Sequence, residues 1–156
     1  MEIEHLKTLS LNPFLNSKII RSFVSGYGKE CVNIELLYLV LPFVFDGYSR
    51  KILTSVNKSS TIYTAFLNSP EKRIVLGNLQ ERYEYMKSLT NEALIVAHNE
   101  RAIILEHKVK LIKGMTYKNV RGKEMKSLLR ASYYLGMIFS KSSNADIFRR
   151  LGVNNI

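Results

Sequence analysis

Lysine and arginine side chains are concentrated in HKVKLIKGMTYKNVRGKEMKSLLR, a stretch in the last third of the 156-residue chain that could bind a polyanion. From residue 108 to residue 126, seven Lys or Arg accompany one acid, Glu124. Tyr117, Asn119 and glycines are interleaved with them, which suits a loop that follows a phosphate backbone more than one that reads bases. The candidate contacts with nucleic acid or an acidic partner are Lys108, Lys110, Lys113, Lys118, Arg121, Lys123, Lys126 and Arg130.

The net charge of +10 is unevenly distributed. Residues 101–156 carry twelve Lys or Arg against three acids, so they supply nine of the ten excess charges. Such an asymmetry points to an anionic partner on one face, and both nucleic acid and an acidic protein surface fit it. A solvated basic surface without a partner is the plainer alternative.

The residues that would support catalysis or metal binding do not form a recognisable set. The chain contains neither GxxxxGK[ST] nor GxGxxG, the loops that cradle phosphates. His5, His98 and His107 lack the spacing of metal ligands, and Cys31 has no assignable base beside it. A lone cysteine and an N-terminus unlike a signal peptide indicate a reducing, cytoplasmic location. We therefore expect a non-catalytic protein with no cofactor.

Helical signals dominate the chain. Asn12-Pro13 predicts a helix start and Gly28 its end. Residues 36–45 form an uncharged run that is too short to cross a membrane and contains Pro42, so we expect a buried helix that Pro42 kinks or ends. Further helices are expected after residues 46, 60 and 69, with another short one starting at Thr90-Asn91-Glu92 and a long amphipathic one over residues 123–140.

One stretch alternates with the period of a strand. Ile103, Leu105, Val109 and Leu111 predict a hairpin over residues 102–113, whereas residues 93–97 fit either a helix or a strand. The expected fold is a single mainly helical domain, residues 1–156, with a small β-hairpin and a basic loop at 108–126. This order of elements is also that of a winged helix, with the hairpin as its wing.

Three hydrophobic segments carry a family resemblance: LNPFLNSKIIRSFVSGY, IELLYLVLPFVF and ADIFRRLGV, in that order. Over residues 12–153 the chain resembles the middle components of bacterial three-component ABC systems, which include the Lamassu-type anti-phage and anti-plasmid defence operons.

The resemblance implies an accessory subunit that bridges the heads of an SMC-like ABC ATPase and an effector, often a nuclease. Double-stranded DNA would be the shared ligand, ATP would bind to the partner, and no membrane would be involved. The alternative is a free-standing winged-helix regulator that binds DNA.

Overall fold

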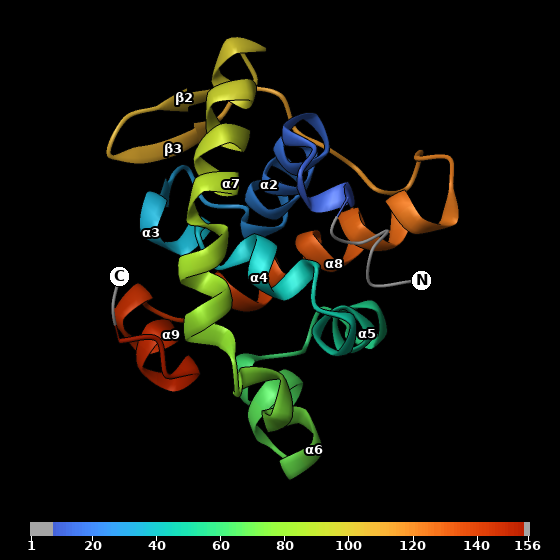
Figure 1. The fold of residues 1–156 in the computed structure, drawn as a ribbon, viewed down its shortest axis with the longest axis vertical. Coiled ribbons are helices and arrows are strands. Elements are labelled where there is room, and N and C mark those ends of the chain that lie inside the picture. The colour runs from blue at the N-terminus through green and yellow to red at the C-terminus, as the bar shows by residue number, and fades with distance from the viewer. Residues whose placement is uncertain (1–7, 155–156) are drawn as a thin grey trace.

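The computed structural model describes residues 8–154 and is mainly helical (Figure 1). In chain order, its first half comprises α2 (Pro13–Tyr27), β1 (Val32–Asn33), α3 (Ile34–Leu37), α4 (Val40–Val44), α5 (Gly47–Ser55) and a π-helical turn (Tyr63–Leu67). The second half comprises α6 (Pro70–Arg73), a 3₁₀ turn (Ile74–Leu76), α7 (Leu79–Asn99), β2 (Ile103–Leu105), β3 (Lys108–Leu111), α8 (Lys123–Phe139) and α9 (Asn144–Leu151). The expected fold class, mainly α with a small β element, is confirmed.

Caps fix the helix ends where the sequence predicts them. The Asn12 side chain accepts hydrogen bonds from the Phe14 and Leu15 amides at 3.0 and 3.2 Å, and Gly28 ends α2 in the left-handed conformation. Asp46 caps α5 through the Ser49 amide at 2.9 Å, and Ser69 caps α6 through the Lys72 amide.

The uncharged run 36–45 is buried as expected, but it forms two short helices instead of one. Leu36, Leu39, Leu41 and Phe43 have no exposed surface. The helix is interrupted at residues 38–39, between α3 and α4, while Pro42 itself lies inside α4. A proline ring clashes with the carbonyl four residues earlier, which here belongs to Tyr38. The break therefore precedes the proline by one turn.

Helix α7 is one continuous helix of 21 residues, so the helix start expected at Thr90 is wrong and residues 93–97 are helical. The Thr90 side chain is fully buried within the helix instead of capping a new one. The buried face of the helix, which includes Leu79, Tyr83 and Met86, continues through Ala93 and Ala97. Burial against α2 and α4 therefore outweighs the local capping signal.

The expected hairpin is present and belongs to a three-stranded antiparallel sheet in the order β1-β3-β2. Ile103 pairs with Leu111, and Val32 of β1 pairs with Val109. The strand β1 is only two residues long, which explains why periodicity did not reveal it.

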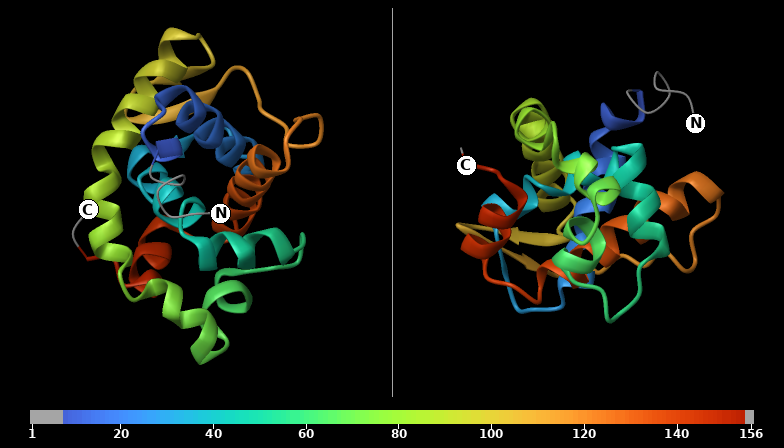
Figure 2. Two further views of the ribbon diagram at one scale, coloured as in Figure 1. Left: turned by 45° about the vertical axis from the view of Figure 1, so that its right-hand side comes forward. Right: turned by 90° about the horizontal axis from the view of Figure 1, so that it is seen from below.

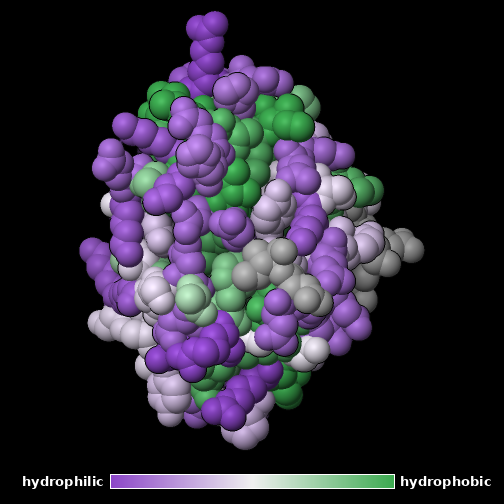
Figure 3. All heavy atoms as spheres, turned by 90° about the vertical axis from the view of Figure 1, so that its left-hand side faces the viewer, coloured by the Kyte–Doolittle hydropathy of each residue, from purple (hydrophilic) through white to green (hydrophobic). Residues whose placement is uncertain are grey.

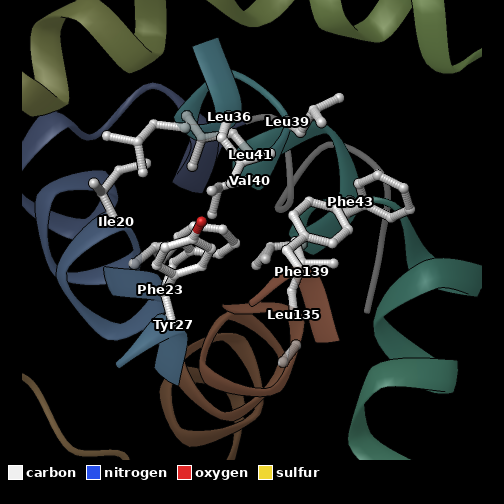
Figure 4. Close-up of a cluster of buried hydrophobic side chains, with 14 of the residues drawn as sticks. Ile20, Phe23, Tyr27, Leu36, Leu39, Val40, Leu41, Phe43, Leu135 and Phe139 are labelled. Carbon is white, nitrogen blue, oxygen red and sulfur yellow. The ribbon is translucent and has the colours of Figure 1, made fainter. Parts of the chain in front are cut away.

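Helices α2 and α8 pack along each other at the centre, with α7 across α2 and α4 beside both (Figures 1 and 2). Figure 4 shows Phe23 and Tyr27 of α2, Val40 and Phe43 of α4, and Phe139 of α8 directed into one cluster. Within residues 8–154, no helix is long and apolar enough to cross a membrane.

Candidate functional site

The segment that joins β3 to α8, residues 112–122, is held against α2 by side chains that the sequence alone did not single out. The Arg21 guanidinium donates to the carbonyl oxygens of Lys113 and Gly114 at 3.1 and 3.2 Å. The Met115 amide donates to the Ser25 hydroxyl at 3.1 Å. Arg21 and Ser25 lie one turn apart on α2, so this helix positions the start of the basic segment.

Lys108 and Lys110 lie on β3 and are exposed, because the intervening Val109 points into the core. Lys113 follows the strand, and its ammonium group donates to the carbonyl oxygen of Glu100, at the C-terminal end of α7, at 3.3 Å. These three cations therefore lie on or beside the hairpin.

The other candidates lie around the start of α8. Lys118, Arg121, Lys123 and Lys126 are exposed. Arg130 is half-buried instead, with its guanidinium carbon 4.9 Å from the ring centre of Tyr134 and 5.6 Å from that of Tyr117. Arg130 is thus a stacked cation and the others are solvated ones.

The candidate cations form a line across the molecule, not one patch. In Figure 1 the hairpin projects on the left, and the orange segment runs from it to the start of α8 on the right. Both views in Figure 2 also separate the hairpin from the loop that precedes α8. Lys108 and Lys110 therefore lie at one end of the line, and Lys118, Arg121 and Lys123 at the other.

Three tyrosines adjoin this line. Ring centres are 5.7 Å apart for Tyr117–Tyr133 and 5.6 Å for Tyr133–Tyr134. Burial, then a hydrogen bond with Tyr134, raises the pKa of the Tyr117 phenol, and the Arg130 charge opposes that shift. A hollow of about 440 Å³ opens beside the cluster. Its lining residues are Ser25, Gly114, Met115, Thr116, Tyr117, Lys118 and Tyr133.

Arg101 is a further cation that the sequence did not reveal as a candidate. It lies between Glu100, whose carbonyl accepts from the Lys113 side chain, and Ala102, whose carbonyl accepts from the Ile112 and Lys113 amides at 2.8 and 3.0 Å. It is exposed, and its φ is 58°. Its backbone conformation has no sequence signature, because glycine is the usual residue there.

A face of different chemistry runs along the outward side of α7. Glu81, Glu84 and Glu92 are exposed on it, as are Tyr85 at 77% and Ile95 at 55%. We call these five residues the α7 stripe. Figure 3 views the molecule from the left-hand side of Figure 1, the side on which the hairpin projects. In the upper half of that view, hydrophobic atoms are exposed among hydrophilic ones. Ile104 of β2, a strand of that hairpin, is also exposed.

Other reactive groups are isolated in the part of the chain that the structure describes. No three His, Cys, Asp or Glu side chains there come together as a metal site. Cys31 is a free, half-buried thiol. His98 and His107 are exposed, whereas His5 lies outside the described residues.

The family described as ABC-three component (ABC-3C) system Middle Component 3 matches residues 1–155. The chain belongs to this family. The resemblance drawn from the three hydrophobic segments is therefore confirmed at the level of the family. This middle component is an accessory subunit of a three-component ABC defence system, not its ATPase, and it has partner subunits. No curated protein and no solved structure matches the chain.

Proposed function

We propose that this middle component is a non-catalytic linker that bridges the heads of an SMC-like ABC ATPase and an effector nuclease in a Lamassu-type system. It acts in the cytoplasm against phages and plasmids, as one domain spanning residues 1–156. Its line of cations contacts the backbone of double-stranded DNA. Family membership supports the role of an accessory subunit, and the arrangement of charges supports the contact with DNA.

The observation that carries the proposal is the presence of two outward faces with different chemistry. The α7 stripe combines exposed carboxylates with Tyr85 and Ile95, a mixture suited to a protein partner. The cation line runs from β3 to α8 and contains only one acid, Glu124, between residues 108 and 126. A subunit that touches both a protein and a polyanion needs two such faces.

The cations suit contact with phosphates more than the reading of bases. Lys108 and Lys110 extend from a strand, and Lys118 and Arg121 extend from irregular backbone. Only Lys123, Lys126 and Arg130 lie on a helix, α8, and Arg130 is stacked on tyrosines. Lysine acts as a point charge toward phosphate and does not require one fixed geometry. We therefore expect binding that depends on salt and little on sequence.

A free-standing winged-helix regulator is the alternative, and the β1-β3-β2 sheet is compatible with that fold. In this chain, however, the helix directly before the hairpin is α7. Its outward side carries Glu81, Glu84 and Glu92, whose carboxylates would repel DNA phosphates. This distribution of charge favours the linker over the regulator.

The test is co-purification with the products of the adjacent genes. Wild type is compared with a variant carrying Lys110→Glu, Lys113→Glu, Lys118→Glu and Arg121→Glu, and with a Lys51→Glu, Lys58→Glu control that also reverses exposed charges. We expect wild type and both variants to form the complex, and only the fourfold variant to lose binding to duplex DNA. Loss of the complex in the fourfold variant would make the cation line a protein-docking surface. Failure of wild type to form any complex would refute the linker role.

A further inference from the structure

We infer that the hollow beside the tyrosine cluster receives the base of an unpaired nucleotide, so that this middle component binds single-stranded nucleic acid more tightly than closed duplex. The inference rests on the proposed contact with nucleic acid and adds a second mode to it. The cations hold the backbone of either form, and the hollow distinguishes the form whose bases are free.

The lining of the hollow has the chemistry of a stacking site. Met115, Tyr117 and Tyr133 supply apolar and aromatic surface, and Ser25 and Thr116 supply hydroxyl groups. Tyr117 is only 8% exposed, whereas Tyr133 is half-buried, so Tyr133 offers the more accessible ring. At about 440 Å³ the hollow is roomy enough for one base. Stacking on tyrosine tolerates any base because every base has a π-face.

Positive charge surrounds the stacking surface. Lys118 lines the hollow itself, and no acidic residue does. Arg130 lies over Tyr117 and Tyr134, and Lys113 directly precedes Gly114 in the lining. Proteins that bind single strands combine cations for the backbone with aromatic side chains for the bases. Both components are present within this one segment and the helix that follows it.

The hollow is preformed, which lowers the entropic cost of binding. Arg21 and Ser25 fix residues 113–115 on one side. On the other side, α8 approaches α2 so closely that a Cβ at Gly26 would lie 1.9 Å from the Tyr133 carbonyl oxygen. The backbone of Tyr133 is therefore held against α2, and its ring lies 5.7 Å from that of Tyr117, which also lines the hollow.

An acidic peptide would also be drawn to this charge, but the shape favours a nucleotide. A helical peptide needs an apolar groove long enough for anchors spaced over two turns. Of the seven residues that line the hollow, Ser25 lies on α2, five are the consecutive loop residues 114–118, and Tyr133 lies on α8. Its lining is therefore shorter than the two-turn groove that a helical peptide needs.

The experiment measures the affinity of the full chain for a single-stranded oligonucleotide and for a blunt duplex of the same sequence, at one salt concentration. The variants are Tyr133→Leu, Tyr133→Phe and, as a control on the α7 stripe, Tyr85→Leu. We expect Tyr133→Leu to weaken single-strand binding by roughly 5- to 150-fold, the effect of losing one base stack, with duplex binding unchanged. Tyr133→Phe keeps the ring and should bind like wild type, as should Tyr85→Leu.

A fluorescent base analogue in the single strand gives a second readout, because stacking quenches its emission. Quenching by wild type and Tyr133→Phe, but not by Tyr133→Leu, is expected. Equal single-strand affinity for wild type and Tyr133→Leu would overturn the inference. Binding of duplex with no preference for single strands would overturn the inference alone. Binding of neither form would refute the proposed contact with nucleic acid as well.

Discussion

At the scale of single residues, Arg101 adopts a backbone conformation that favours glycine, yet its side chain carries a positive charge. Among the described residues it is the non-glycine residue with positive φ, 58°. It follows the end of α7, where the Ala102 amide donates to the Ala97 carbonyl at 2.9 Å, a closure that normally uses glycine. An arginine there strains the backbone and places a cation beside Lys113. The strain is tolerated at a position where the side chain is exposed and near the cation line.

We predict that Arg101→Gly stabilises the fold and weakens binding to DNA. Relief of the left-handed conformation should raise the free energy of unfolding by about 0.5–1 kcal/mol. Loss of one cation should lower DNA affinity at low salt. Urea unfolding and a DNA titration measure the two effects, and Arg101→Lys, which keeps both charge and strain, should change neither. A less stable Arg101→Gly protein would contradict the interpretation of strain.

At the scale of elements, small residues set the crossing of α2 and α8. Ser22 and Gly26 on α2 face Ser132 and Gly136 on α8, and in each helix the two are four residues apart. The Ser22 hydroxyl donates to the Leu129 carbonyl at 2.7 Å, and the Ser132 hydroxyl donates to the Ile19 carbonyl at 2.6 Å. Two buried hydroxyls thus satisfy their hydrogen bonds across the interface, and each bonds the backbone of the opposite helix.

We predict that Gly26→Ala and Gly136→Ala each destabilise the protein, although alanine is the better helix former. A Cβ at Gly136 would lie 2.1 Å from the Phe23 carbonyl oxygen, and backbone atoms cannot move aside without separating the helices. Overpacking of this kind costs about 1–3 kcal/mol, more than the roughly 1 kcal/mol gained in helix propensity. Gly47→Ala in α5 is the matched control, because a Cβ there meets nothing within 4 Å. Thermal unfolding should separate the first two from the control, and equal stabilities would refute the close contact.

The sequence predicted the helices and the hairpin better than the junctions between them. In the candidate site, it pointed to the exposed lysines but not to the contacts that position their loop. The caps at Asn12 and Ser69 bond amides no more than three residues away, so the local sequence reveals them. The continuity of α7 through Thr90 depends on packing against α2, which no local pattern records. The exposed lysines follow from counting charges. The anchoring of their loop by Arg21 depends on a contact 92 residues away, and the hollow depends on that contact in turn.

At the scale of the whole molecule, the cation line forms a path from the hairpin to the start of α8. Lys108 and Lys110 lie at the hairpin and Lys118 and Arg121 before α8, with the fixed segment 112–115 between them. The α7 stripe leaves the outward side of that helix to a different kind of partner. If one stretch of DNA follows the path, cations at both ends neutralise phosphates of the same molecule, and both must contribute to the dependence of binding on salt.

We therefore predict that two variants, Lys108→Gln with Lys110→Gln and Lys118→Gln with Arg121→Gln, lose affinity for duplex DNA by similar amounts. Each pair should reduce the slope of log K against log salt by up to about 1.8, because each neutralised phosphate contributes roughly 0.9. Lys58→Gln should leave the slope unchanged, because Lys58 is exposed and lies beside Lys141, after the opposite end of α8. The slopes come from titrations at several salt concentrations. An effect confined to one pair would confine the DNA contact to that end, and the other end would then be free to meet a protein.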